Sequence, residues 1–318
     1  MIEIDHLTKR FDTFAAVDDL SFNVREGEVL GFLGPNGAGK STTMKIITGF
    51  LAPTSGTVKV DGHDITEDPM AVKSLIGYLP EGAPSYPDMT VLEFLEFIAE
   101  VRGLTGDEKV RRVQHVIDQV ALESVCHQTI DTLSKGFKRR VGLGQAILHD
   151  PKVLILDEPT DGLDPNQKLH VRELIRNLAQ DKIVIVSTHI LEEVTAVCTR
   201  AIIIANGRIV ADGVPHELES RSRYHRAVAV SFSREFDLRA ALEGESGIAD
   251  IEVRPDEPRS FTVVPEPDTA LFDRLMTLSR EQDWPLEELY VVRGQLEDFF
   301  RRITTPDRQA AAAAEARQ

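Results

Sequence analysis

The stretch VLGFLGPNGAGKST, residues 29–42, decides the fold of the first two thirds of the chain. Gly34, Gly39, Lys40 and Ser41 have the spacing G-x-x-x-x-G-K-[ST], the apolar run VLGFL precedes them, and TTMKIITGF follows. This order predicts a strand, a glycine-rich loop and a helix. Glycines let backbone N–H groups turn inward to surround an anion, and the start of the helix attracts negative charge. We therefore expect a phosphate-binding loop.

A nucleoside triphosphate is the expected ligand of this loop. Lys40 would neutralise the β- and γ-phosphates, and Ser41 would ligate Mg²⁺. ATP and Mg²⁺ are thus the predicted cofactors. The predicted nucleotide-binding residues are Gly34, Pro35, Asn36, Gly37, Ala38, Gly39, Lys40, Ser41 and Thr42.

Two apolar stretches predict buried parallel strands that end in reactive side chains. KVLILDEP (152–159) ends in Asp157 and Glu158, and KIVIVSTH (182–189) ends in His189, with the amphipathic pattern HVRELIRNLAQ between them. Ligands of open α/β sheets bind at the carboxyl edge of the strands. We expect Asp157 to be the second protein ligand of the metal. Glu158 is the expected general base that polarises the attacking water.

Composition limits the classes of function. The chain has 318 residues, 42% hydrophobic and 28% charged, which fits a globular protein of two domains. The net charge of -16 argues against nucleic acid as the main partner. The two cysteines, Cys126 and Cys198, are far apart and predict a reducing compartment. The start of the chain has no apolar signal core, and no apolar run approaches the ~20 residues that span a bilayer. A membrane role would require a partner chain.

The chain divides into segments that differ in composition and in hydrophobic pattern. Residues 1–65 predict a β-rich region, interrupted by a helix that begins at Lys40, and residues 82–150 predict helices. The polar segment ELESRSRYHR (217–226) reads as a linker. A β-α-β-β-α-β pattern follows, which favours a small ferredoxin-like α+β domain. We place a first domain at 1–218, an accessory domain at 219–305 and a disordered tail at 306–318.

Residues 1 to about 218 resemble the nucleotide-binding subunit of an ABC transporter. The resemblance rests on the phosphate loop, the DEP strand and the STH strand end in this order. It implies a P-loop NTPase fold of the ABC type, with a mixed β-rich and RecA-like core and a helical subdomain at about 82–150. The family stacks the adenine on an aromatic residue upstream of the loop. TKRFDTF places Phe11 there, where tyrosine is more usual.

LSKGF, residues 133–137, stands where the family carries its LSGGQ signature. The resemblance implies that two chains pair head to tail and that each signature binds the ATP of the other chain. Ser134 and Gly136 match the motif, whereas Lys135 and Phe137 replace the usual glycine and glutamine. The Lys135 charge would complement a γ-phosphate.

Three further residues gain a role from the resemblance. Glu81 stands where the family usually has a glutamine that reaches toward the metal and the water, and its carboxylate is a third candidate metal ligand. Asp164 in DGLDP (161–165) would lie along the dimer interface. His189 would contact the γ-phosphate and help to position the water.

The resemblance implies an ATPase that works with a separate integral membrane permease of about six helices, at the cytoplasmic face of the membrane. The second ATPase would be another copy or a homologue. Contact with the permease is expected after the Glu81 loop, where Tyr86, Met89, Leu92 and Phe94 are candidates, although half of them would be core. VVRGQLEDFFRRIT (291–304) resembles the tail of export-type ATPases. An importer subunit, a non-transport ABC ATPase acting on ribosomes or DNA, and a nucleotide-binding regulator without turnover remain the alternatives.

Overall fold

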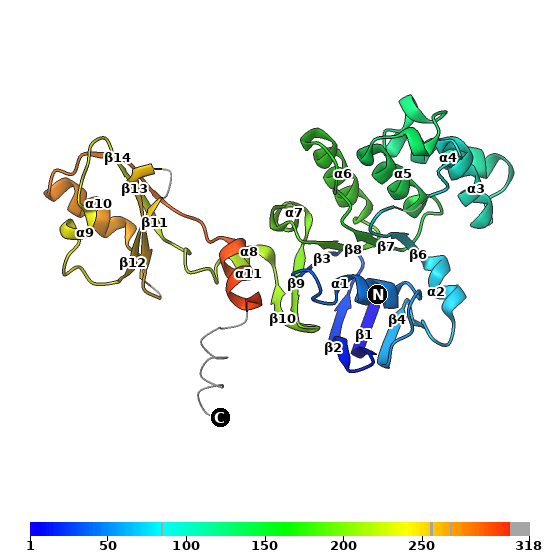
Figure 1. The fold of residues 1–318 in the computed structure, drawn as a ribbon, viewed down its shortest axis with the longest axis horizontal. Coiled ribbons are helices and arrows are strands. Elements are labelled where there is room, and N and C mark those ends of the chain that lie inside the picture. The colour runs from blue at the N-terminus through cyan, green and yellow to red at the C-terminus, as the bar shows by residue number, and fades with distance from the viewer. Residues whose placement is uncertain (84, 255–256, 268, 306–318) are drawn as a thin grey trace. The chain divides into compact units, whose positions relative to one another are not determined.

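A computed structural model describes residues 1–83, 85–254, 257–267 and 269–305 (Figure 1). The chain forms two compact units, Met1–Val214 and Pro215–Gln318. Each unit has its own hydrophobic core.

The first unit begins with an antiparallel sheet of order β2-β1-β4-β5. Its strands are β1 (Ile2–Phe11), β2 (Phe14–Val24), β4 (Ser55–Val60) and β5 (His63–Asp64). Buried and exposed residues alternate along β4 and the second half of β2, as expected where one face of an antiparallel sheet covers the core. The predicted β-rich start is therefore confirmed.

The second sheet has the order β10-β9-β3-β8-β7-β6 and is parallel except for β10. Its strands are β3 (Val29–Leu33), β6 (Ile76–Leu79), β7 (Val153–Asp157), β8 (Ile183–Thr188), β9 (Arg200–Ala205) and β10 (Arg208–Gly213). All residues of β3, β7 and β8 are buried, which explains their uninterrupted apolar sequences. The predicted parallel βαβ unit is confirmed, whereas the four-residue strand β6 was not predicted.

Helices of the first unit follow the predicted pattern, with two additions. They are α1 (Lys40–Ile47), α2 (Pro69–Leu75), α3 (Val91–Val101), α4 (Gly106–Gln119), α5 (Lys135–Ile147), α6 (Pro165–Leu178) and α7 (Leu191–Val197). Helices α2 and α7 were not predicted. Apolar residues of α3, α4 and α5 share one core, so the segment that the sequence predicts to be helical forms a packed subdomain (Figure 1).

Helix α5 is fastened to the edge strand β6 by side chains that donate to carbonyl groups. Arg139 donates to the Pro80 carbonyl at 2.8 Å, Gln145 to Tyr78 at 2.6 Å and His149, just after the helix, contacts Ile76 at 3.2 Å. Alternate carbonyls of a strand point to the same side, and those of an edge strand need partners from outside the sheet. The strand that leads into Glu81 is thereby held against α5.

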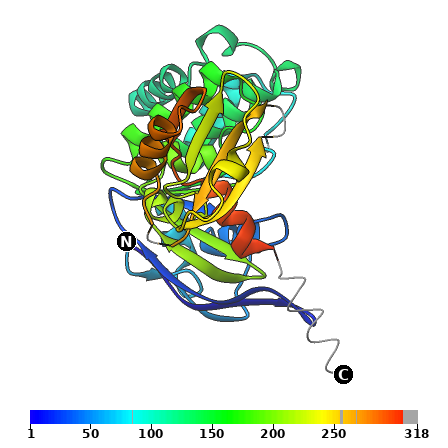
Figure 2. The same cartoon turned by 90° about the vertical axis from the view of Figure 1, so that its left-hand side faces the viewer.

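The second unit contains a four-stranded antiparallel sheet of order β12-β13-β11-β14. Its elements in chain order are α8 (Pro215–Glu219), β11 (Val228–Phe232), α9 (Leu238–Ala241), β12 (Ile248–Arg254), β13 (Glu257–Pro265), α10 (Phe272–Glu281), β14 (Leu286–Val291) and α11 (Leu296–Thr304). Figure 2 shows α10 along one face of this sheet, where its leucines join the core. Between β11 and β14 the order is β-α-β-β-α-β, as the sequence pattern predicts.

The segment predicted to be a polar linker is folded instead. Helix α8 extends to Glu219, and the Ser222 hydroxyl donates to the buried Asp298 carboxylate of α11 at 3.0 Å. The prediction of a linker was wrong. The polar composition of the segment does not reveal that Asp298, far along the chain, accepts hydrogen bonds from it. The expected tail at 306–318 lies outside the described residues.

Candidate nucleotide-binding site

The glycine-rich loop joins β3 to α1 and has the backbone that a phosphate cradle needs. Gly39 caps the helix with a φ of 108°, in the left-handed region that favours glycine. A Cβ at this position would lie 2.4 Å from the Ala16 carbonyl oxygen, so no other residue fits. The loop therefore depends on this glycine, and the helix begins at Lys40 as predicted.

Lys40 turns back over the loop. Its ammonium group donates to the Gly34 carbonyl at 2.6 Å and to the Pro35 carbonyl at 3.2 Å, and the residue is 8% exposed. Burial lowers the pKa of Lys40, while the carboxylates of Glu158 and Asp157 act in the opposite direction. The Lys40 ammonium group can replace its two carbonyl contacts by contacts with phosphate oxygens. A cation placed beside a phosphate loop in this way is suited to neutralising phosphate charge.

Strands β3, β7 and β8 bring the predicted reactive residues to one edge of the sheet. Leu33, which precedes the loop, pairs with Thr188, which precedes His189. Asp157 at the end of β7 pairs with Ser187 of the same strand β8. The three strands are parallel neighbours, so their carboxyl ends meet where the sequence places the phosphate loop, the acidic pair and the histidine.

Asp157 is the buried acid of this edge. It is 3% exposed, and no Lys, Arg or His atom lies within 4 Å of its carboxylate in the described part of the chain. Burial raises the pKa of Asp157, the Glu81 charge adds to this effect, and the Arg139 and Lys40 cations oppose it. A buried carboxylate without a close counter-charge is suited to a hard divalent cation.

Glu158 and His189 form a close pair. The His189 Nδ1 atom lies 2.7 Å from Glu158 Oε1, and the carboxylate can only accept, so Nδ1 carries the hydrogen. Glu158 has a φ of 53°, which is uncommon for a residue with a side chain, and its N–H donates to the Ser187 carbonyl at 2.8 Å. The backbone turn directs the Glu158 carboxylate toward His189 instead of along the strand.

The aromatic candidate, Phe11, lies at the end of β1 and is 46% exposed. The Lys9 ammonium group lies over its ring, 5.2 Å from the ring centre. Phe14, its partner across the hairpin, is 62% exposed and presents a second aromatic face. Phe11 is thus not a core residue.

The signature segment begins helix α5. Ser134 is the N-cap residue, and its hydroxyl accepts from the Phe137 N–H at 3.3 Å. Lys135 forms an ion pair with Asp161 of the same chain at 2.8 Å, which lowers the pKa of Asp161. Gly136 is buried, and a Cβ there would lie 2.8 Å from Gln167. The free chain therefore holds Lys135 against its own DGLDP loop.

Glu81 and Asp164 were also predicted to belong to the site. Glu81 is exposed in the turn after β6. The Asp164 carboxylate caps helix α6 by accepting from the Gln167 N–H at 2.9 Å. The Asp164 contact stabilises the start of helix α6, and the roles of both carboxylates at the nucleotide stay predictions.

Four residues near the site were not predicted from the sequence. Arg139 is 5% exposed and extends from α5 to the loop that holds Glu81. Thr160, Thr188 and Glu193 form a buried hydrogen-bonded group directly behind Glu158 and His189. Their positions next to DEP and STH were a possible signal, but nothing in the sequence showed that the three side chains meet.

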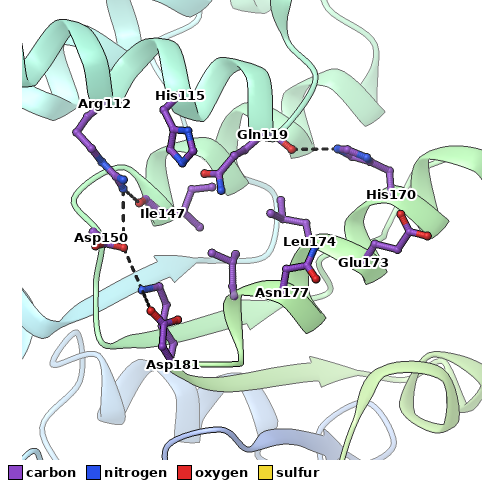
Figure 3. Close-up of a pocket in the computed structure, with 12 residues that line it drawn as sticks. Arg112, His115, Gln119, Ile147, Asp150, His170, Glu173, Leu174, Asn177 and Asp181 are labelled. Carbon is purple, nitrogen blue, oxygen red and sulfur yellow. Dashed lines mark hydrogen bonds and ion pairs between the residues drawn. The ribbon is translucent and has the colours of Figure 1, made fainter.

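A separate cavity of about 390 Å³ lies between α4, the end of α5 and α6 (Figure 3). Asp150 links Arg112 at 4.0 Å to Lys182 at 3.0 Å, and His170 contacts the Gln119 carbonyl at 3.0 Å. None of the predicted site residues lines this cavity.

Comparisons with known proteins agree with this geometry. Residues 17–161 match the family model described as ABC transporter. The chain is 39% identical over 223 residues to the uncharacterized ABC transporter ATP-binding protein YxlF of Bacillus subtilis, covering 70% of this chain and 74% of the relative. It is 37% identical to the linearmycin resistance ATP-binding protein LnrL of the same organism, covering 70% and 71%. It is 38% identical to the Nod factor export ATP-binding protein I of Paraburkholderia xenovorans, covering 68% and 72%.

Some relatives are much longer. The chain spans 25% of ABC transporter A family member 1 of Dictyostelium discoideum. Among solved structures, the dimeric post-hydrolysis state of the cassette MJ0796 with ADP and Pi superposes with a TM-score of 0.64 at 25% identity. The match covers 68% of this chain and 99% of that one.

The fold and the site define a P-loop nucleotide-binding protein. More particularly, the chain belongs to the ATP-binding proteins of ABC transporters and is an ABC ATPase. The predicted family, the P-loop NTPase fold of the first unit and the ATPase activity are thereby confirmed. In the part of the chain that the structure describes, no helix is long and apolar enough to cross a membrane.

Proposed function

We propose that the chain hydrolyses ATP as a head-to-tail dimer and thereby drives an export-type transporter whose permease is a separate chain. The observation that carries the proposal is the meeting of the phosphate loop, Asp157, Glu158 and His189 at one sheet edge. The contact of 2.7 Å between Glu158 and His189 supports a shared role in water activation.

Hydrolysis in this site would proceed by in-line attack of water on the γ-phosphate. Lys40 exchanges its two carbonyl contacts for phosphate oxygens and neutralises their charge. Glu158 accepts the proton of the water, and His189 holds one Glu158 oxygen and presents its other ring nitrogen toward the γ-phosphate. Positioning and charge neutralisation would supply most of the acceleration.

The oxygen atoms of Asp157 and Ser41 fit a magnesium ion. Mg²⁺ is usually held by one or two protein oxygens together with phosphate oxygens and water. The buried carboxylate of Asp157 and the Ser41 hydroxyl, in the first turn of α1, are oxygen ligands of this kind. The exposed Glu81 is a further candidate. When bound, the ion would neutralise charge on the β- and γ-phosphates.

The dimer is supported by the dimeric cassette that the chain resembles. In such a dimer the Ser134 hydroxyl and the Gly136 backbone would bind the ATP of the second copy or of a homologous subunit. Lys135 would have to leave Asp161 to reach a γ-phosphate. This ion pair is largely exposed, so breaking it costs less than about 1 kcal/mol. Asp164 would lie along the interface.

A groove beside α3 supports contact with a permease. A cavity of about 400 Å³ is lined mostly by apolar and aromatic side chains, among them Phe50, Met70 and Val101, which are 74%, 73% and 65% exposed. Phe94, a predicted groove residue, is core instead, whereas Tyr86 is 55% exposed and packs edge-on against Phe97. Large apolar side chains grouped at a surface are typical of interaction sites. We infer that a cytoplasmic segment of the permease occupies the groove and holds the chain at the cytoplasmic face of the membrane.

The direction of transport is inferred from the relatives and from the second unit. Two of the relatives are named for linearmycin resistance and for Nod factor export. The β-α-β-β-α-β order and the strand order of the second unit favour a ferredoxin-like domain. The accessory domain of importers is typically a β-barrel instead. We therefore favour export over import.

The test uses a Glu158→Gln variant of the full chain, which should bind ATP without hydrolysing it. The variant is trapped with ATP in native cells and crosslinked, and the proteins that co-purify are identified by mass spectrometry. The control is the same variant trapped with ADP. We expect a polytopic membrane protein to co-purify with the variant trapped with ATP but not with the variant trapped with ADP. Ribosomes or DNA-repair factors in its place would exclude the transport role, and a Glu158→Gln protein with wild-type turnover would exclude Glu158 as the base.

A further inference from the structure

Glu193 of helix α7 is a buried acid that the reaction scheme above does not use. It is 3% exposed, and none of the described Lys, Arg or His side chains lies within 4 Å of its carboxylate. A buried carboxylate without a paired cation is costly unless hydrogen bonds compensate for the lost water. The residues that donate to Glu193 therefore indicate what it does.

Two threonines donate to this carboxylate, one to each oxygen. The Thr160 hydroxyl donates to Glu193 Oε1, and the Thr188 hydroxyl lies 3.2 Å from Glu193 Oε2. Both threonines are at most 2% exposed. Thr160 follows Glu158 by two residues, and Thr188 directly precedes His189. Glu193 therefore connects the two chain segments that carry the proposed base and the proposed histidine.

The Thr188 hydroxyl stands between two carboxylates. Its oxygen lies 3.3 Å from Glu158 Oε2 and 3.2 Å from Glu193 Oε2, and it accepts from the Ile190 N–H at 3.1 Å. A hydroxyl has one hydrogen, so it gives a full hydrogen bond to only one of these carboxylates. Buried polar groups must be satisfied within the protein. The better buried carboxylate, Glu193, therefore takes the hydrogen.

The acceptor of the Thr188 hydrogen matters because His189 already donates to the other oxygen of Glu158, Oε1. Glu158 Oε2 is the oxygen that remains for the attacking water. A hydrogen bond from Thr188 to this oxygen would compete with the water and stabilise the ionised carboxylate, which weakens it as a base. With the hydrogen directed to Glu193, Oε2 is open.

We propose that Glu193 is a positioning residue for hydrolysis: it draws the Thr188 hydrogen away from Glu158 and so keeps Glu158 Oε2 free to accept the proton of water. This inference rests on the proposed role of Glu158 as the base. Glu193 itself touches neither nucleotide nor water. Its effect passes through Thr188, and Thr160 holds the opposite oxygen of Glu193 in place.

The first test replaces Glu193 by glutamine in the full chain. Glutamine has the same shape, and its Oε1 still accepts from Thr160, but its amide nitrogen donates to Thr188. The Thr188 hydrogen then has Glu158 Oε2 as its remaining acceptor. We expect kcat for ATP hydrolysis to fall about tenfold or more, within the range that a general base contributes. The KM for ATP should stay within about twofold.

The matched control is Glu192→Gln on the same helix. Glu192 carries the same charge as Glu193 and is its neighbour in sequence. Its side chain is 78% exposed and pairs with Arg172, and it contacts neither threonine. Its kcat should equal that of the wild type. A kcat for Glu193→Gln within twofold of the wild type would overturn the inference.

A rescue experiment separates this role from a merely structural one. In the double variant Glu193→Gln/Thr188→Val the redirected hydrogen is absent, so kcat should recover at least threefold relative to Glu193→Gln alone. A structural role of Glu193 predicts an equal or larger loss instead. The single variant Thr188→Val tests the same inference without depending on the folding of Glu193→Gln. Its kcat should stay within about threefold of the wild type. A loss of tenfold or more would mean that Thr188 assists Glu158, contrary to the inference.

The outcome also separates this inference from the proposed function. A wild-type chain without ATPase activity, or a Glu158→Gln variant with full activity, would refute the assignment of the base itself. An active wild type, an inactive Glu158→Gln and a fully active Glu193→Gln would refute only the role of Glu193.

Discussion

Acid should destabilise the first unit through His149, which fastens the end of α5 to strand β6. Its Nε2–H donates to the Ile76 carbonyl at 3.2 Å, which leaves Nδ1 as the nitrogen that would take up a proton. Nδ1 is buried, and within the described residues it has no hydrogen-bond partner. Burial lowers the pKa of His149 from 6.5 to about 4, and the nearby Arg102 and Arg112 cations add to this effect.

The sign and the size follow from proton linkage. The folded state has the lower pKa, so between pH 6.5 and about pH 4 the unfolded chain binds a proton that the folded chain does not. The contribution of His149 to stability is therefore complete above pH 6.5 and is lost progressively as the pH falls from 6.5 through 4. At about 1.4 kcal/mol per pH unit, the total loss is about 3.5 kcal/mol, of which about 2 kcal/mol has occurred at pH 5.

The assay compares the wild type with His149→Gln in urea at pH 7.5 and pH 5. Glutamine keeps a donor at the Nε2 position but does not titrate in this range. Far-UV circular dichroism is the appropriate signal, because the single tryptophan, Trp284, lies in the core of the second unit. All other titrating groups are common to the two proteins. The stability advantage of the wild type over the variant should therefore shrink by about 2 kcal/mol on acidification. An advantage that is the same at both pH values would refute the reasoning.

Three further perturbations test the nucleotide site. Lys40→Met should weaken ATP binding tenfold or more in a fluorescence titration, because hydrogen bonds to charged groups contribute about 1.5–3 kcal/mol; unchanged affinity would exclude Lys40 as a phosphate ligand. Phe11→Ala should weaken ATP binding about tenfold through lost base stacking, while Phe14→Ala should not; equal losses would leave the stacking residue unassigned. Asp161→Asn should change stability by less than about 1 kcal/mol because its ion pair with Lys135 is largely exposed. By releasing Lys135 it should also strengthen ATP-dependent dimerisation in sedimentation, and weaker dimerisation would contradict a trans role for this lysine.

Much of the site was predictable because its residues are fixed by local rules. The position of Gly39 has a φ of 108° and no room for a Cβ, so it requires glycine, and the spacing of Gly39 from Gly34 and Lys40 makes the phosphate loop visible in the sequence. Strands buried on both faces have to be apolar throughout, which made β7 and β8 visible. Their last residues were then expected at the carboxyl edge of the sheet.

Strand β6 could not be predicted in the same way. Strand β6 has four residues, too few to show a period, and it is held at the sheet edge by contacts with α5 that are about 60 to 70 residues distant in sequence. Its existence depends on those partners more than on its own residues.

The sequence by itself determined the phosphate loop, the buried strands β7 and β8 and the family, because these depend on spacing, on backbone conformation and on the burial of whole strands. Only the tertiary structure decided which polar groups meet. It paired Lys135 with Asp161, fastened Arg139 to the loop of Glu81, and placed Glu193 behind Thr188. A hydrogen bond requires donor and acceptor atoms to lie about 2.7–3.2 Å apart, and the spacing of residues along the chain does not show which atoms of different elements approach that closely.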